Sequence, residues 1–197
     1  MLNDFTTSLR PALVLTALFA LLLGLAYPTA LTGIGQLVFP AQANGSLIRQ
    51  NGKVIGSELI GQAFAGAGYF HGRPSVAGKG YDATASGGSN LGPTSKALMD
   101  RIKGDLASLS PAGTRVPPDL VTTSASGLDP HISPEAALFQ VPRVASARGL
   151  PEADVRDLVE RHKQEPLLGF LGEPRVNVLE LNLALDRLAQ GSARPVR

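Results

Sequence analysis

The sequence predicts a membrane-anchored α+β protein, in which one N-terminal transmembrane helix precedes a single mixed α/β extracytoplasmic domain with many loops. No Asp, Glu, Lys, Arg or His occurs between Arg10 and Arg49, and a helix needs about 20 apolar residues to cross a bilayer. The later segments combine amphipathic helical periodicity with short β-type runs. The 22 Gly and 15 Pro residues among 197 predict abundant loops.

The membrane helix is expected over residues 12–34, after a short cytoplasmic lead of residues 1–11. Residues 12–31 include eight Leu, one Val and one Phe, which together favour insertion by about 3 to 6 kcal/mol. A cleaved signal peptide is the alternative, because residues 40–43 have the small-x-small form of a cleavage site. The apolar run is longer than a usual signal core and lies well upstream of Ala43, which favours an anchor.

Two features of this helix predict its surroundings. Arg10 is the cation that flanks it, so the positive-inside rule places the N-terminus in the cytoplasm and the domain on the other side. Ala20 and Gly24 lie four residues apart, a spacing that lets a second helix approach closely. We expect this pair to pack on a partner helix, with chance occurrence of two small residues as the alternative.

A neck of residues 35–45 is expected to join the helix to a soluble domain over residues 46–190, which a disordered tail of residues 191–197 follows. Asn51 and Gly52 stand between two short apolar runs. An Asn-Gly pair in this setting is the strongest short-range signal for a β-hairpin.

Three helices are expected within the domain before its last segment. The first covers residues 95–109, where apolar residues recur on one face. Ser133 and Pro134 begin the second as its N-cap and first helical residue, and Pro142 should break or kink it. The third covers residues 151–163, with acidic residues at its start and basic residues at its end.

Two further elements complete the expected domain. Residues 120–123 have the composition of a strand. Asn177 and Glu180 form a capping box for the last helix. The apolar face of that helix consists of Val178, Leu181, Leu185 and Leu188.

Composition excludes several classes of function. The net charge of +2 and the 5% of aromatic residues argue against nucleic acid as a partner, since both a basic footprint and stacking platforms are missing. The chain has no Cys. Disulfides, thiolate nucleophiles and Cys-based zinc sites are therefore excluded.

A loop rich in Gly and Ser is the first candidate for binding a ligand, and it consists of Ser86, Gly87, Gly88, Ser89 and Asn90. It lacks the Lys of a phosphate-binding P-loop, so a tight turn that needs glycine is the favoured interpretation. Short loops of this kind can nevertheless direct several backbone N–H groups at an anion.

Ser126, Asp129 and His131 lie close together in the sequence and have the residue types of a hydrolytic triad. The Gly-x-Ser-x-Gly elbow is absent, so we favour a turn whose side chains bond the local backbone. No catalytic residue is assigned. His71, His131 and His162 lack the spacing of zinc ligands, so no metal site is expected, and His162 is expected in the core.

Seven motifs occur in order between the anchor and the last helix. They are Tyr27-Pro-x-x-x-Thr-Gly33, Phe39-Pro-x-Gln-Ala-Asn-Gly-Ser46, Gly56-Ser-x-Leu-Ile-Gly-Gln-x-Phe64, Tyr69-Phe-x-Gly-Arg-Pro-Ser75, Ser86-Gly-Gly-Ser-Asn-Leu-Gly-Pro-Thr94, Ser126-Gly-Leu-Asp-Pro-His-Ile-Ser-Pro134 and Val176-Asn-Val-Leu-x-Leu-Asn182. Together they resemble the C subunit of the bacterial Kdp potassium-transporting P-type ATPase.

The resemblance implies a non-catalytic accessory subunit in the bacterial plasma (inner) membrane. The implied partners are a channel-like potassium-translocating subunit, a P-type ATPase subunit that hydrolyses ATP and a very small hydrophobic subunit, which together import potassium with high affinity. The subunit is implied to support assembly and to act as a catalytic chaperone that raises the affinity of the ATPase subunit for ATP, with ATP binding attributed to it. Gln62 and the loop of residues 86–90 are the candidates for nucleotide or partner contact.

The implied role in ATP use conflicts with the expected orientation, because an extracytoplasmic domain cannot reach cytoplasmic ATP. Either the effect passes through the membrane subunits or the orientation is inverted. Two other functions stay open as alternatives. One is a membrane-tethered hydrolase that uses Ser126 and His131, and the other is an ion-funnelling module at the outer mouth of the pump, to which Asp82 and Asp129 would contribute charge.

Overall fold

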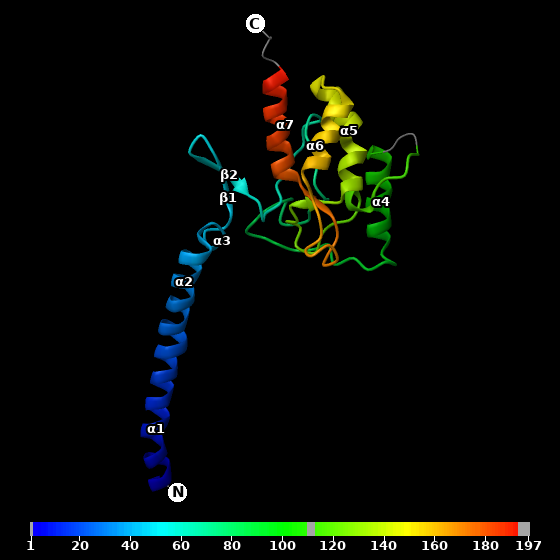
Figure 1. The fold of residues 1–197 in the computed structure, drawn as a ribbon. Coiled ribbons are helices and arrows are strands. Elements are labelled where there is room, and N and C mark those ends of the chain that lie inside the picture. The colour runs from blue at the N-terminus through cyan, green and yellow to red at the C-terminus, as the bar shows by residue number, and fades with distance from the viewer. Residues whose placement is uncertain (1, 110–112, 193–197) are drawn as a thin grey trace. The chain divides into compact units, whose positions relative to one another are not determined.

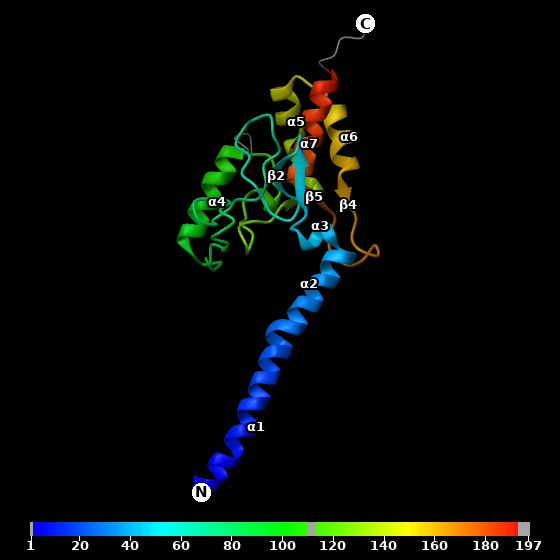
Figure 2. The ribbon, with the colours of Figure 1, turned by 90° about the vertical axis from the view of Figure 1, so that its left-hand side faces the viewer.

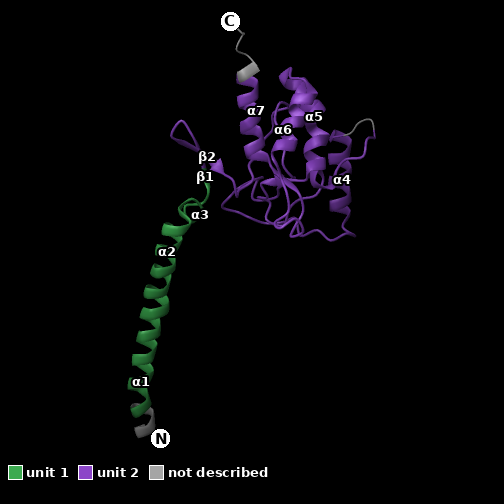
Figure 3. Cartoon of the chain, in the orientation of Figure 1, with its two compact units in different colours: residues 1–47 green, residues 48–197 purple. Residues whose placement is uncertain are grey.

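The computed structural model describes residues 2–109 and 113–192 of the chain (Figure 1). The chain divides into two compact units, residues 1–47 and residues 48–197 (Figure 3). Unit 1 is an apolar helix and unit 2 is a mixed domain of helices and short strands. The predicted α+β class, with one N-terminal apolar helix followed by a mixed domain, is therefore confirmed.

Unit 1 consists of α1 (Leu2–Leu21), a π-helical turn η1 (Leu22–Ala26), α2 (Tyr27–Val38) and the short α3 (Pro40–Ala43). The stretch from Thr7 to Val38 is long and apolar enough to cross a membrane. The helix begins before and ends after the predicted residues 12–34, because extending a formed helix by one residue costs far less than starting one.

The π-helical turn lies directly before a proline. The backbone N–H of Tyr27 donates to the carbonyl oxygen of Leu22, five residues earlier. Pro28 has no N–H, and in an α-helix its ring would clash with the carbonyl of Gly24, four residues before it. A wider turn at this point gives the proline ring room while keeping the neighbouring backbone groups paired, as the interior of a bilayer requires.

The predicted hairpin follows unit 1 and is formed by β1 (Leu47–Gln50), whose first residue ends unit 1, and β2 (Lys53–Ser57). Asn51 and Gly52 both adopt positive φ values, 51° and 77°, as the favoured two-residue turn requires. From residue 58 to residue 95 the chain then has no helix or strand. This long segment depends on side chains of other elements for its shape.

The core is a three-stranded antiparallel sheet packed with helices. Its strand order is β3 (His131–Ile132), β5 (Arg175–Asn177) and β4 (Lys163–Gln164), with His131 opposite Asn177 and Lys163 opposite Val176. Helix α6 (Glu152–Arg161) packs against both α5 (Pro134–Arg148) and α7 (Val178–Ser192) (Figures 1 and 2). Fully buried members of this core include Ile132, Val141, Val144, Val155, Val159, Val176, Leu181 and Leu185.

Helix α5 shows where local signals were right and where packing overrode them. The N–H of Ala136 donates to Ser133 Oγ at 3.1 Å, so the predicted N-cap is confirmed. Of the predicted break or kink at Pro142, the break is wrong, because the helix continues to Arg148. Val141 and Val144, on either side of the proline, are fully buried, and this packing offsets the hydrogen bond that the proline removes.

Two other expectations were wrong. Residues 120–123 are not a strand, because Pro117 and Pro118 lead into the 3-10 turn η2 (Pro118–Leu120). His162 is not a core residue: α6 ends before it, and its Nδ1 lies 2.8 Å from the carbonyl oxygen of Leu158 at the end of the helix.

The helix predicted at residues 95–109 is present as α4 (Lys96–Leu109). None of its described residues is buried, and Met99 is 48% exposed. The periodicity therefore predicted the helix but not its burial. The capping interaction of α7 is confirmed in part, since Asn177 Oδ1 accepts a hydrogen bond from the N–H of Glu180 at 3.2 Å.

Candidate functional site

The candidate site is built around the segment Tyr69–Ser75, which has no helix or strand although Phe70 is fully buried. Buried backbone groups require hydrogen-bond partners. The N–H of Phe70 donates to Asn182 Oδ1 at 2.8 Å, and Asn182 Nδ2 donates to the carbonyl oxygen of Phe70 at 2.9 Å. A single amide on α7 thus satisfies both backbone groups, as a neighbouring strand would.

Gln140 on α5 makes the same pair of bonds to the next residue. The N–H of His71 donates to Gln140 Oε1 at 2.8 Å, and Gln140 Nε2 donates to the carbonyl oxygen of His71 at 3.0 Å. Arg143 Nη2 also donates to Gln140 Oε1, at 2.7 Å, which orients the amide. Two helices therefore hold this segment through buried amides.

The start of the segment is held by charge. The guanidinium of Arg148 lies 4.4 Å from the centre of the Tyr69 ring, a cation–π arrangement. Its Nη1 pairs with Asp186 Oδ1 at 2.7 Å, and its Nε donates to the carbonyl oxygen of Gly68 at 2.6 Å. Arg148 thus ties the loop to both α5 and α7.

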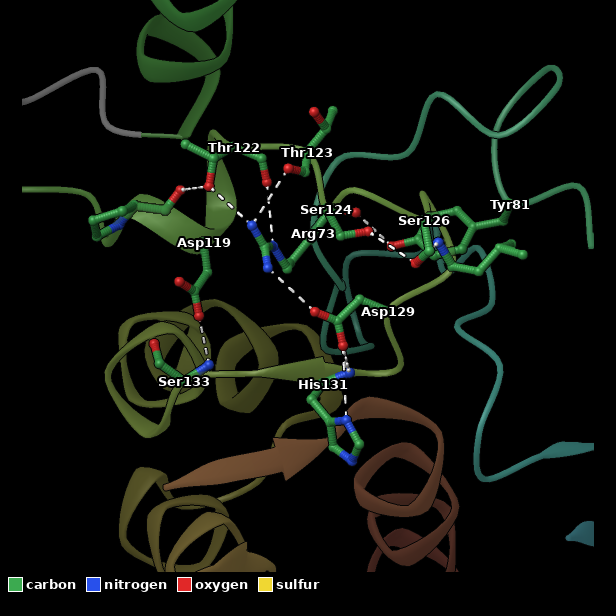
Figure 4. A network of polar contacts seen from close by, with 12 residues as sticks. Arg73, Tyr81, Asp119, Thr122, Thr123, Ser124, Ser126, Asp129, His131 and Ser133 are labelled. Atoms are coloured by element: carbon green, nitrogen blue, oxygen red, sulfur yellow. Dashed lines mark hydrogen bonds and ion pairs between the residues drawn. The ribbon is translucent and has the colours of Figure 1, made fainter. Parts of the chain in front are cut away.

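Arg73, at the other end of the segment, joins it to the turn that follows η2 (Figure 4). Its Nη1 donates to Asp129 Oδ2 at 3.2 Å, and its Nε donates to the carbonyl oxygen of Thr122 at 3.3 Å. Asp129 Oδ1 accepts from the N–H of His131 at 3.0 Å. Burial raises the pKa of Asp129, but the hydrogen bonds from His131 and Arg73 outweigh it and hold that pKa below its usual value.

Two cavities adjoin this network. One of about 340 Å³ is polar, and its lining includes Arg73, Asp119, Asp129, His131, Glu173 and Arg175. The other, of about 280 Å³, lies between the segment and α4, and its lining includes His71, Tyr81, Asp105 and Leu109. Burial, helped by the charge of Asp129 and opposed by Arg73, raises the pKa of Tyr81 to about 12, so its hydroxyl stays protonated and donates to the carbonyl oxygen of Arg73.

The cavities carry charges of both signs, and two of the acidic groups that line the polar cavity, Asp119 and Asp129, are already engaged. Asp119 Oδ2 accepts from the N–H of Ser133 at 2.6 Å, and Asp129 is held by Arg73. Among the residues that the structure describes, no group of three His, Cys, Asp or Glu is placed to hold a metal ion. The arrangement is that of a structural network that fixes loops.

The serine and histidine of the hydrolase interpretation do not meet. Ser126 Oγ accepts from the N–H of Leu128 at 3.1 Å and lies 3.5 Å from Ser124 Oγ. His131 instead faces Asp129, with Nδ1 3.7 Å from Oδ1. No hydrogen bond within the described part of the chain joins Ser126 to His131, so the geometry supports the turn and gives the hydrolase no nucleophile–base pair.

The loop of residues 86–90 packs on the same turn. The N–H of Gly87 donates to the carbonyl oxygen of Ser126 at 2.9 Å, and the Ser86 hydroxyl donates to the same oxygen at 3.0 Å. A Cβ on Gly88 would lie 2.9 Å from the carbonyl oxygen of Ala125. Some of the donors that an anion would need are therefore already used within the fold.

Gln62 lies in a different environment from that loop. Its Nε2 donates to the carbonyl oxygen of Ile55 at 3.3 Å, and it fills the space beside Gly56, where a Cβ would come within 1.8 Å of Nε2. The structure thus brings residues 86–90 to Ser126 and brings Gln62 to β2.

Asn182, Gln140 and Arg148 were missed as site residues in the sequence. Asn182 stands between the apolar positions Leu181 and Leu185 of α7, and Gln140 precedes the buried Val141 of α5. A polar residue inside an apolar helix face is a usable signal, because such a residue is seldom buried without a specific partner.

The chain is similar over residues 9–187 to the family model described as KdpC: K+-transporting ATPase, c chain. It is 63% identical over 181 residues to the potassium-transporting ATPase KdpC subunit of Caulobacter vibrioides, with 90% of this chain and 92% of the relative covered. The proteins of the same name in Bradyrhizobium diazoefficiens and Nitratidesulfovibrio vulgaris are 60% and 57% identical, with 92% and 95% of this chain and 97% and 98% of the relatives covered. The matched residues include most of the apolar helix and the buried core residues of unit 2, from Phe70 to Leu185.

Proposed function

Because the chain belongs to the KdpC family of K+-transporting ATPase c chains, we propose that it stabilises the assembly of the subunits that carry potassium and hydrolyse ATP. The family match confirms the resemblance seen in the seven motifs and makes the protein an accessory subunit of a potassium uptake complex. The proposed partners are the channel-like subunit, the P-type ATPase subunit and the small hydrophobic subunit, in a bacterial inner membrane.

The observation that carries the proposal is that the described residues contain one helix long and apolar enough to cross a membrane, from Thr7 to Val38. An ion pathway needs several helices around polar groups, so one helix cannot supply it. The site network fixes loops, and the hydrogen bonds of the described residues in unit 2 pair neither Ser126 nor Ser124 with His131. The chain is therefore suited to holding other subunits, with transport and hydrolysis carried out by them.

We propose that Ala20 and Gly24 form the contact of this helix with a partner helix. A Cβ on Gly24 would meet nothing within 4 Å in the described chain, so the small face is open to a neighbour. Ala20→Leu and Gly24→Leu should reduce co-purification of the other subunits, because each adds bulk where two backbones approach. Leu18→Phe, two positions from Ala20 and on the other side of the helix, is the matched control. Unchanged assembly of both variants would refute this contact.

The proposed orientation has the N-terminus in the cytoplasm and unit 2 outside. The chain has no Cys, so a single introduced thiol reports its own location. Ser86→Cys should react with a membrane-impermeant maleimide in intact cells, and Ser8→Cys should react only after the cells are opened. The reverse pattern would show that unit 2 is cytoplasmic.

With unit 2 outside, the proposed chaperone effect on ATP affinity must be transmitted through the other membrane subunits. The contacts that Gln62 and residues 86–90 make within the fold support this indirect form. The complex lacking this chain, or carrying a poorly assembled variant, should show a higher apparent KM for ATP, while the isolated full chain in detergent should not bind ATP. ATP binding by the isolated chain that Ser86→Ala together with Ser89→Ala abolishes would instead establish direct contact.

A further inference from the structure

The loop between β4 and β5 exposes an unusual amount of apolar surface. Its apolar tip, residues 166–172, carries Leu167, Leu168, Phe170 and Leu171, whose exposed fractions are 71%, 74%, 73% and 50%. In Figures 1 and 2 this loop lies at the end of unit 2 away from the last turn of α7. Contiguous exposed apolar residues of this kind mark contact with a protein or a membrane.

Several backbone groups of the apolar tip are paired with one another. The N–H of Leu167 donates to the carbonyl oxygen of Leu171 at 3.1 Å, and the N–H of Leu171 donates back at 2.9 Å. The N–H of Gly169 donates to the carbonyl oxygen of Pro166 at 2.9 Å. These bonds close the turn and lower the number of unpaired polar groups that it would carry into an apolar medium, where each unpaired group is costly.

Charge is confined to the base of the loop. No charged residue occurs from Pro166 to Gly172. At the base, Lys163 Nζ pairs with Glu165 at 2.8 Å, and Arg175 Nε donates to Gln164 at 3.1 Å. The side chains at the tip are thus apolar and those at the base are polar, as in a segment that crosses from water into the surface of a bilayer.

We propose that the apolar tip rests in the surface of the lipid bilayer, as a second membrane contact of this chain. The membrane helix ends at Val38, and unit 2 begins at Ile48. Ten residues reach at most about 35 Å, and a domain of this size has a radius of gyration of about 15 Å. The tether therefore keeps unit 2 close enough for the tip to reach the bilayer.

The residue types favour lipid over a protein partner. Protein interfaces concentrate their binding energy in Trp, Tyr and Arg, with Leu under-represented. Three of the four exposed side chains of the tip are Leu and the fourth is Phe, which are among the residues that insert most favourably into membranes. The inference goes beyond the proposed function and depends only on the membrane anchor.

A tryptophan reporter tests the proposal, because the natural chain has no Trp. Full-length Phe170→Trp is placed in vesicles whose acyl chains carry bromine, a short-range quencher of indole emission. It should lose most of its emission relative to unbrominated vesicles, whereas Met99→Trp on the exposed face of α4 should not. If bromination lowered the emission of Phe170→Trp and of Leu167→Trp no more than that of Met99→Trp, the proposal would be overturned.

Photocrosslinking in the assembled complex tests the competing occupant. Leu168→Cys, carrying a photoreactive group attached before assembly, should give an adduct with lipid. An adduct with another subunit in place of lipid would overturn the proposal and assign the tip to a protein interface. Leu168→Asp should leave assembly intact, which separates failure of this inference from failure of the proposed function.

Discussion

Asn182→Leu tests whether one amide shapes the long segment without regular structure. Asn182 is 1% exposed, and its two bonds to Phe70 join residues 112 apart in the sequence. Leucine has the same branched shape with bulkier ends, and it leaves the N–H and carbonyl of Phe70 buried and unpaired. Each such group costs about 1 to 3 kcal/mol, so the free energy of unfolding should fall by about 4 kcal/mol, within a total of roughly 5 to 15 kcal/mol.

The assay is urea unfolding of the full chain in detergent, followed by circular dichroism. In a thermal melt of the same sample, a loss of about 4 kcal/mol corresponds to a fall in Tm of roughly 8 to 16 °C for a domain of this size. Gln190→Leu, at an exposed position on the same helix, is the matched control and should stay within about 0.5 kcal/mol of the parent. If Asn182→Leu were as stable as this control, the amide would not hold the segment, and the site would need another explanation.

Three other substitutions test separate features of unit 2. Gly88→Ala should destabilise the chain by about 1 to 3 kcal/mol, because its Cβ would lie 2.9 Å from a backbone oxygen, whereas Gly87→Ala, which meets nothing within 4 Å, should be neutral in the same urea assay. Burial, helped by the charge of Arg143 and opposed by the carbonyl of Gly66, lowers the pKa of His71 below 6.5; the unfolded chain therefore binds the proton first, and stability should fall as the pH drops below about 6.5. His71→Gln should flatten that fall in urea midpoints measured from pH 7 to pH 5, and an unchanged slope would contradict it. Ser133→Ala removes the N-cap of α5 and should cost about 1 kcal/mol, while a neutral result would mean that Pro134 alone fixes the start of the helix.

Elements set by neighbouring residues could be predicted from the sequence. The Asn51-Gly52 hairpin, the N-cap of α5 and the apolar face of α7 all depend on contacts within a few positions, and each was confirmed. Pro142 shows the limit, since burial of its neighbours against other helices outweighed the local rule. The periodicity of α4 likewise marked a helix but could not show that none of its residues is fully buried in the described chain and that Leu109 packs only partly against the core.

The candidate site was harder to predict because its bonds join distant residues. Arg73 and Asp129 are 56 residues apart, and His71 and Gln140 are 69 apart. The sequence placed Arg73, Asp129 and His131 in motifs but gave no sign of how they pair. Ser126 and His131 illustrate the converse, since two residues close in sequence face different partners.

The π-helical turn at residues 22–26 divides the membrane helix into two rotational frames. One extra residue in a turn rotates everything after it by about 100° relative to an unbroken α-helix. The sides of the chain that face one neighbour before Leu22 and after Ala26 therefore follow two separate series of positions. A substitution scan along this helix should therefore show two periodic patterns of sensitive positions, with an offset at Gly24. One membrane helix can in this way turn different sides toward the neighbours of its first half and of its second half.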